Sequence, residues 1–480
     1  MKHYDIIIIG GGVVGAAIAR ELSRYKVKVA VLEKEEELAF GVSKSNSGII
    51  HPGTQNKKGT LKGRLCVEGN KLTRSIAKEL GVDFKEVGEL ICAFDEAEVA
   101  RLTELKDQAG QLGVPKLKIV NREWLSEHEP NLNPQVIAAL YAPTAGIISP
   151  YRWVYDLAEN AVRNGVAIFT NTTVETIAVQ KDGIDHFKIC TTQGAFTTQF
   201  IINAAGLFAD DIARMLGIGD FTIRPRRGEE FLLDKKRAYL TNHLLFPLPT
   251  KNSKGVLVIK TSDGNPMVGP TAIDSNDKED LSTSDAGLEK VFSSARRMVP
   301  SIQERDIIAY FSGLRPVAGD DFIIRHEDSV PGCITVAGIQ SPGLTAAPAI
   351  ARMVIQLLSQ HGCRLKKKFF FHRFRQKTNH LFQIPFEQTK KLIKKNPAYG
   401  DIVCRCEMVS AQEVREAIQR GARTLDGIKF RTRAQAGRCH GGFCTTRIMK
   451  ILAEELNKPL TEITKRGAGS EMVVKERGNG

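Results

Sequence analysis

The first thirty-odd residues of the chain alternate between continuous apolar runs and one helical pattern. Residues 4–9 form a nearly unbroken β-branched run, which is typical of a strand buried on both faces of a parallel sheet. Three glycines at 10–12 end the run, and apolar residues then recur at helical spacing as far as Leu22. A second apolar run covers 27–32. This order predicts a strand, a helix and a second parallel strand.

Similar segments recur further along the chain. They are a helix over 151–164 that leads to a strand at 166–169, a strand at 200–204, and a strand at 333–337 that leads to a helix over about 346–358. Residues 89–141 and 224–315 lie between these pieces and carry alternating patterns, such as Gly255 to Ile259. We therefore expect an α/β fold in which a Rossmann-like part is interleaved with a second, mixed-sheet part that serves the substrate.

Composition narrows the class of protein. A length of 480 residues predicts two or three domains, and 42% hydrophobic with 25% charged residues is typical of a globular chain. The formal charge of +14 is spread along the sequence, with one dense run at 366–375, and no nucleic-acid motif accompanies it. No apolar run has spanning length, and Met1 leads almost directly into a strand, so we expect a cytoplasmic protein.

The glycine turn carries the first chemical signal. Gly10, Gly12 and Gly15 follow a predicted strand and open a predicted helix, and Glu33 stands just after the second strand. In this context the pattern predicts a dinucleotide site, in which glycines admit the pyrophosphate and the acidic residue binds the ribose hydroxyls. The chain has no second such motif after a strand. Because flavoenzymes that use pyridine nucleotides need two sites, the single motif favours a resident FAD.

A family resemblance agrees with this interpretation. The segment 43–53 (SKSNSGIIHPG) resembles the loop that contacts the isoalloxazine in the D-amino-acid oxidase-like FAD family, especially its glycerol-3-phosphate and 2-hydroxyglutarate branches. The segments 202–206, 311–316 and 337–345 agree, and the resemblance spans roughly residues 1–358. Together with the glycine motif, it implies FAD contacts by Gly10, Gly12, Val14, Gly15, Glu33, Val42, Ser43, Ser47, Gly48, Ile49, Val174, Gly206, Gly338, Gly343 and Leu344.

The oxidised substrate needs a base and an anchor. His51 is the candidate catalytic base, because its ordinary pKa lies near operating pH and the resemblance places its loop beside the flavin. Arg315 is the best candidate anion anchor, since a guanidinium can grip phosphate or carboxylate with two hydrogen bonds. Lys260 and Thr345 match further substrate-anchoring positions of the glycerol-3-phosphate branch.

The substrate class follows from these anchors. An arginine with a lysine suits a doubly charged phosphate, so we expect oxidation of sn-glycerol 3-phosphate to dihydroxyacetone phosphate. L-2-Hydroxyglutarate, or an amino or imino acid such as sarcosine or proline, stays an alternative, because arginine also binds carboxylates. A non-catalytic electron-transfer subunit of a larger complex is the alternative from another class.

Four cysteines cluster near the C-terminus. Cys404 and Cys406 form a C-X-C pair, and Cys439 and Cys444 form a C-X4-C pair. The narrow first pair favours an iron-sulfur cluster over a zinc ribbon. Residues 401–457 resemble the bacterioferritin-associated ferredoxin-like [2Fe-2S] domain. Arginines 431, 433 and 438 are expected to offset the negative charge of the cluster.

The domain organisation follows from these pieces. We expect an FAD-dependent oxidoreductase domain at 1–360 (FAD part about 1–88, 142–223 and 316–360; substrate part about 89–141 and 224–315), a linker at 361–400, a small α-helical [2Fe-2S]-binding domain at 401–460 and a tail at 461–480. Electrons should pass through the cluster to a partner subunit or quinone. The basic, phenylalanine-rich stretch at 364–373 is interpreted as a solvated linker whose rings pack on a neighbour, in preference to a peripheral membrane contact.

Overall fold

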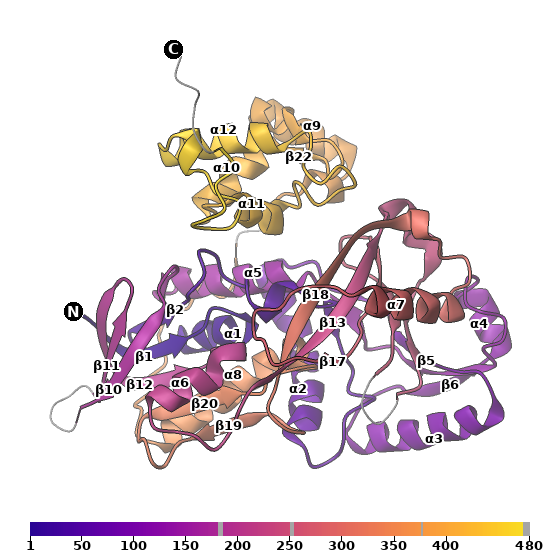
Figure 1. Ribbon diagram of the computed structural model, residues 1–480, viewed down its shortest axis with the longest axis horizontal. Helices are drawn as coiled ribbons and strands as arrows, with labels where there is room; N and C mark the ends of the chain where they lie inside the picture. The colour runs from indigo at the N-terminus through magenta and orange to yellow at the C-terminus, as the bar shows by residue number, and fades with distance from the viewer. Residues whose placement is uncertain (181–185, 250–253, 376–377, 474–480) are drawn as a thin grey trace.

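The computed structural model of the chain describes residues 1–180, 186–249, 254–375 and 378–473. Two interleaved units form the body, and a small C-terminal unit lies on it above helix α5 (Figure 1). Residues 474–480, the end of the expected tail, lie outside the described part. None of the described helices combines the length and the apolar character that a membrane crossing requires.

The first unit is built on an eight-stranded sheet. Five parallel strands lie in the order β9-β2-β1-β12-β20; β10 and β11 extend it beyond β12, and β19 pairs with β20. The bounds are β1 Lys2–Ile9, β2 Val29–Leu32, β9 Ala167–Phe169, β10 Val174–Val179, β11 Phe187–Thr191, β12 Gly194–Asn203, β19 Ile323–His326 and β20 Cys333–Ala337.

Both faces of this sheet are covered, as the apolar run at 4–9 predicts. Ile6 and Ile8 point to one face and pack in the cluster formed with helices α1, α5 and α8. Ile7 and Ile9 point to the other face and pack with helix α6. The helices are α1 Val13–Leu22, α2 Leu61–Leu80, α5 Pro150–Arg163, α6 Ala209–Met215 and α8 Gly343–Gln360. Successive strand residues alternate sides, so a strand apolar at every position needs cover on both.

The second unit is a nine-stranded mixed sheet. Its strand order is β17-β13-β16-β15-β14-β5-β7-β6, and β18 pairs along the whole of β13. The bounds are β5 Glu89–Ala93, β6 Lys118–Asn121, β7 Ala138–Ala142, β13 Arg224–Leu233, β14 Leu244–Pro247, β15 Leu257–Lys260, β16 Pro266–Gly269, β17 Ile273–Asp274 and β18 Ile307–Val317. Helices α3 (Glu96–Gln111), α4 (Arg122–His128) and α7 (Asp285–Met298) flank this unit (Figure 1).

A third, three-stranded sheet in the order β3-β8-β4 carries the chain toward the site. Its bounds are β3 Ile49–Ile50, β8 Gly146–Ile147 and β4 Lys85–Glu86.

The C-terminal unit has its own apolar core of residues from 403 to 463. It contains α10 (Ala411–Gln419), α11 (Leu425–Thr432), α12 (Thr445–Leu456) and the short strands β21 (Ile402–Cys404) and β22 (Val409–Ser410). Ser410 accepts a hydrogen bond from the Glu413 backbone N–H, and the Glu413 carboxylate accepts one from the Ser410 backbone N–H, which confirms the expected start of α10.

The larger differences between the predicted elements and the structure lie at helix α8 and before the small unit. Helix α8 begins at Gly343, three residues earlier than predicted, directly after Pro342. The segment 361–400, expected to be a linker, contains helix α9 (Phe386–Lys395). None of the α9 side chains is buried, so the helix lies on the surface and adds nothing to a core.

Candidate functional site

The turn between β1 and α1 and the first turn of α1 each contain one position that accepts only glycine. Gly10 has φ 111°, and a Cβ there would lie 2.4 Å from the carbonyl oxygen of Ala204. A Cβ on Gly15 would lie 2.0 Å from the carbonyl oxygen of Gly10, because the helix packs directly on the turn. The backbone is therefore open at the point where a dinucleotide pyrophosphate meets a helix N-terminus.

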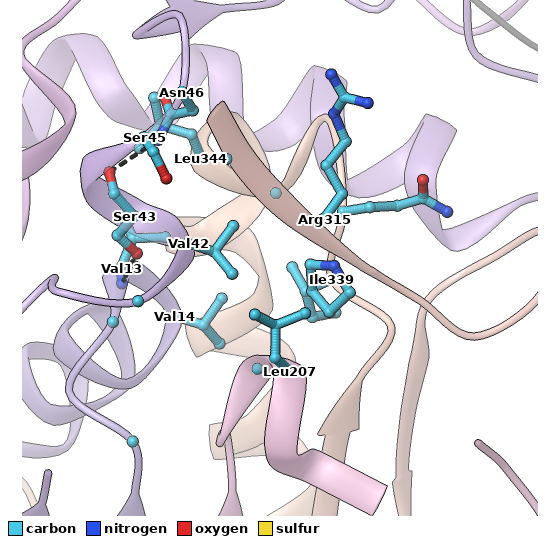
Figure 2. A pocket seen from close by; sticks show the side chains of 18 of the residues that line it. Val13, Val14, Val42, Ser43, Ser45, Asn46, Leu207, Arg315, Ile339 and Leu344 are labelled. Atoms are coloured by element: carbon cyan, nitrogen blue, oxygen red, sulfur yellow. Dashed lines mark hydrogen bonds between the residues drawn. The ribbon is translucent and has the colours of Figure 1, made fainter. Parts of the chain in front are cut away.

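The loop at 42–47 packs against this helix start (Figure 2). Ser43 lies in the short 3-10 helix Val42–Lys44, and its Oγ accepts a hydrogen bond of 2.9 Å from the backbone N–H of Val13. The Asn46 side-chain amide donates to the Ser43 carbonyl oxygen at 2.8 Å, which fixes the loop that follows. The loop is thereby held over the end of α1.

Glu33 follows β2 and reaches back toward the turn. Its Oε2 accepts a hydrogen bond of 2.6 Å from the Gly11 N–H, and its Oε1 accepts one of 3.0 Å from the Glu35 N–H. Burial raises the pKa of Glu33 above its ordinary value, while these backbone donors oppose the rise. The carboxyl group borders the cavity described next, as a ribose-binding residue requires.

One cavity of about 590 Å³ joins the two large units. Apolar side chains such as Val14, Val42, Leu207 and Leu344 surround it (Figure 2). Of the expected FAD-contacting residues, those on the cavity wall are Gly10, Gly12, Val14, Glu33, Val42, Ser43, Ser47, Ile49, Val174, Gly206, Gly343 and Leu344. The glycine cradle, the carboxyl group and the apolar wall together fit an FAD molecule.

Three residues of that expected set do not line the cavity. Gly15 lies under the turn, as described above. Gly48 has φ 68°, and a Cβ there would lie 2.3 Å from the carbonyl oxygen of Ile148. Gly338 has φ 64°, and a Cβ there would lie 3.1 Å from the Ala318 Cβ. These glycines shape the backbone around the cavity, and their contact with FAD stays a prediction.

His51 borders the cavity on the loop after β3. Its backbone N–H donates to Thr345 Oγ1 at 2.9 Å, and its carbonyl oxygen accepts from the Asn70 side chain at 3.0 Å. Its Nδ1 lies 3.8 Å from Glu89 Oε2. Burial, and then the positive charge of Lys254, lower the pKa of His51 to about 4, whereas Glu89 opposes the shift. The imidazole is therefore neutral at ordinary pH and able to accept a proton.

Arg315 and Lys254 bring positive charge to the His51 end of the cavity. Arg315 lies on β18 and donates to the Thr271 carbonyl oxygen at 3.2 Å, and its side chain borders the cavity (Figure 2). Burial lowers the pKa of Lys254, and the charges of Glu89 and Arg315 act on the same group. The two cations and the imidazole thus share one region, which suits an anionic substrate.

A buried carboxyl group accompanies these cations. Glu230 lines the cavity, and its Oε1 accepts a hydrogen bond of 3.2 Å from Ser47 Oγ. Burial raises the pKa of Glu230 to about 7, with Arg315 and the Ser47 hydroxyl opposing the rise. Below that pH the carboxyl group is mostly protonated, so it offsets less of the positive charge of Arg315.

Two of the expected substrate anchors lie elsewhere. Lys260 ends β15 and does not line the cavity; Lys254, three residues before that strand, does. Thr345 is fully buried, and its Oγ1 is occupied by the His51 N–H and by the Ile49 carbonyl oxygen. Thr345 therefore positions the histidine loop and does not contact the cavity. Lys254, Glu230 and Glu89 were not predicted, because no local motif marks them.

The four clustered cysteines form two close pairs. Cys406 Sγ lies 3.5 Å from Cys439 Sγ, near the roughly 3.7 Å that tetrahedral geometry gives for two sulfurs on one metal at about 2.3 Å. A hydrogen bond from Cys444 lowers the pKa of Cys404 to about 6, with backbone N–H groups of Gln435 and Glu407 acting in the same direction.

The pairing suits two metal atoms. Within the described ranges no three Cys, His, Asp or Glu side chains converge as they would on a single metal ion. A [2Fe-2S] cluster takes two thiolates at each iron, so two pairs fit it, and N–H groups directed at the sulfurs are typical of such sites.

Three arginines, expected to balance the cluster charge, instead fasten the small unit to the body. Arg431 pairs with buried Glu37 at 2.7 Å, and Arg433 pairs with buried Asp263 at 2.9 Å. Arg438 pairs with Asp234 at 2.8 Å. Arg433 has φ 73° at the end of α11 and also bonds Glu407, which follows Cys406. The expected role is corrected: these charges form an interface.

Comparison with known proteins agrees with both expected cofactors. Residues 5–357 match the family described as FAD dependent oxidoreductase, and residues 402–454 match the BFD-like [2Fe-2S] binding domain. The chain is 43% identical to a glycerol 3-phosphate dehydrogenase of Caloramator mitchellensis, over 98% of each chain. It is 38% identical to a glycerol 3-phosphate oxidase of Mycoplasma pneumoniae, over 75% of this chain and 95% of that one.

A solved structure shows the same fold. The dithionite-reduced L-α-glycerophosphate oxidase from Mycoplasma pneumoniae with FAD bound superposes with a TM-score of 0.75 at 34% identity, covering 79% of this chain and all of that one.

Proposed function

Because the chain belongs to the FAD-dependent oxidoreductase family and ends in a BFD-like [2Fe-2S] binding domain, we propose that it is a dehydrogenase that oxidises sn-glycerol 3-phosphate to dihydroxyacetone phosphate. The observation that carries the substrate assignment is the shared position of Arg315, Lys254 and His51 at one end of the cavity. Two cations suit a phosphate dianion better than a single carboxylate.

Different residues of the chain accept the proton, hold the phosphate and position the catalytic loop. FAD, when bound, accepts a hydride, and a [2Fe-2S] cluster passes on single electrons. Neutral His51 accepts the proton of the substrate hydroxyl. Its Nδ1 is the nitrogen near Glu89, which leaves Nε2 for the substrate. Arg315 and Lys254 hold the phosphate, and Thr345 fixes the loop that carries the base.

Electron exit through the small unit supports a dehydrogenase over an oxidase. The Mycoplasma oxidases match about three quarters of this chain over nearly their whole length, whereas the Caloramator dehydrogenase matches it end to end. Cys406 is exposed, and so are the neighbouring side chains of Met408 and Phe443. The cluster would thus be accessible to a partner subunit or a quinone.

Anaerobic reduction of the flavin tests the substrate. The holoprotein is mixed with glycerol 3-phosphate, L-2-hydroxyglutarate, proline or sarcosine, and the flavin absorbance is followed. We expect glycerol 3-phosphate to bleach the flavin band and the other three to leave it. Bleaching by another compound alone would refute the assignment, and a protein bleached only by dithionite would be a non-catalytic electron-transfer subunit.

The rate of peroxide formation in air distinguishes a dehydrogenase from an oxidase. With glycerol 3-phosphate present, the holoprotein should reduce a one-electron dye much faster than it forms peroxide. Peroxide formation at the rate of dye reduction would identify an oxidase.

A further inference from the structure

A basic and aromatic segment, residues 364–375, leaves the oxidoreductase body toward the small unit. Its phenylalanines do not all pack on a neighbour as expected from sequence. Phe369 is 90% exposed and Phe370 is 80% exposed, with ring centroids 4.8 Å apart. No large apolar side chain in the described part of the chain is more exposed than Phe369. Exposed aromatic pairs of this kind mark interaction sites.

The backbone on both sides of the two rings is held in place by contacts with the body. Before them, the Lys368 N–H donates to the Arg24 carbonyl oxygen at 2.8 Å. After them, the Phe371 ring lies 4.5 Å from the Arg24 guanidinium carbon, and the His372 N–H donates to Asn164 Oδ1 at 2.8 Å. The exposure of the pair is therefore a property of the fold, since hydrogen bonds hold the chain on both sides of it.

Exposed basic residues lie around the backbone that carries the two rings. Lys366 and Lys367 are exposed, and the Lys366 carbonyl oxygen accepts from the N–H of Lys26, which is also exposed. Arg163 is exposed and donates to the Phe374 carbonyl oxygen.

Two carboxylates near this part of the backbone are already paired with arginines. Glu21 pairs with Arg24, and buried Glu79 pairs with Arg20 and Arg373. The surface around the rings thus carries an excess of positive charge.

We propose that this segment docks on a bilayer that contains anionic lipids, with Phe369 and Phe370 entering the interfacial layer and Lys366 and Lys367 facing the headgroups. A convex pair of rings suits a soft lipid interface, whereas the anchors of protein interfaces fill pockets. Each lysine near an anionic surface adds attraction that salt screens. The chain would thereby reach a membrane without a spanning helix.

Vesicle flotation of the full holoprotein tests the proposal. The vesicles are phosphatidylcholine alone, or phosphatidylcholine with phosphatidylglycerol as the minor component. We expect binding to the anionic vesicles only, weakened by salt. The double substitution Phe369→Ser with Phe370→Ser should reduce the partition coefficient by at least about tenfold, and Lys366→Gln with Lys367→Gln by about tenfold or more.

Phe386→Ser supplies the matched control. Phe386 is 71% exposed on α9, so its loss removes a comparable ring from another surface, and vesicle binding should be unchanged. Retained flavin and cluster absorbance shows that each variant is folded. Equal binding to neutral and anionic vesicles, no binding at all, wild-type binding by the Phe369/Phe370 variant, or equal loss in the Phe386 control would each overturn the proposal.

Discussion

The residues that form the cavity are spread along most of the chain, whereas the residues that form the four-cysteine centre lie close together in the sequence. The cavity wall takes residues from Ile9 to Leu344, in both large units, and most of them offer backbone or apolar surface. The cysteine centre takes four side chains between 404 and 444, each of which supplies one thiolate. FAD is held by many weak contacts, so each single substitution in the cavity should lower its affinity by a limited amount. The cluster is held by four bonds to cysteine, so loss of one cysteine should prevent the cluster from binding.

Loss of one cysteine should have the largest effect. We expect Cys439→Ser to abolish the [2Fe-2S] cluster while FAD stays bound, because the remaining three thiolates leave one iron without a complete pair. Iron and labile-sulfide analysis with a flavin assay measures both. Cys190→Ser, which changes a partly buried cysteine of β11 outside the cluster, is the control and should keep full iron. Full iron in the Cys439 variant would remove this cysteine from the ligand set.

Loss of a cation at the substrate end should have the next largest effect. Lys254→Met should raise KM for glycerol 3-phosphate by about 10- to 100-fold, as expected for a charged hydrogen bond of about 1.5–3 kcal/mol. Lys260→Met should change KM by less than about threefold, because Lys260 does not line the cavity. Steady-state kinetics with a dye acceptor compares the two. A larger rise in KM for Lys260→Met than for Lys254→Met would support Lys260, the anchor predicted from sequence.

A methyl group under the glycine turn should weaken FAD binding by a smaller amount. Gly15→Ala places a Cβ 2.0 Å from the Gly10 carbonyl oxygen, so helix and turn must separate, at a cost of about 1–3 kcal/mol. We expect the Kd for FAD to rise about 5- to 150-fold in titrations of the apoprotein. Gly110→Ala in α3 is the control, since Gly110 does not line the cavity and a Cβ there meets nothing within 4 Å. Equal affinities would contradict the tight turn.

The pH dependence of flavin reduction should show the smallest effect. Burial and the charge of Lys254 both disfavour protonated His51, so its pKa falls to about 4 and the neutral base persists into acid. At saturating glycerol 3-phosphate, the reductive rate should decline only as pH approaches about 4. Glu89→Gln should move the decline to still lower pH, because Glu89 favours the protonated form. A decline centred at the ordinary histidine pKa of about 6.5 would show that burial does not tune this residue.

Local signals account for what the sequence could predict. The β1-turn-α1-β2 order and the start of α10 depend on neighbours within a few residues, and both are confirmed. Lys254 and Glu230 lie in separate strands or loops of the second sheet, and only the pairing of β13, β15, β16 and β18 brings them to His51. Such non-local pairing leaves no pattern in a single sequence. The interface arginines were missed for the same reason, since their carboxylate partners lie in distant segments.

Buried Glu37 has a consequence for how the gene of this protein can change. Glu37 belongs to the body, yet its carboxylate accepts hydrogen bonds from the Arg423 N–H, the Thr424 hydroxyl and the Arg431 guanidinium, all in the small unit. Loss of the Glu37 carboxylate while the small unit is present would leave buried Arg431 without its partner, and breaking a buried pair in this way costs about 3–5 kcal/mol. The attachment of the ferredoxin-like unit thus depends on the residue at position 37, and we expect that position and the small unit to change together.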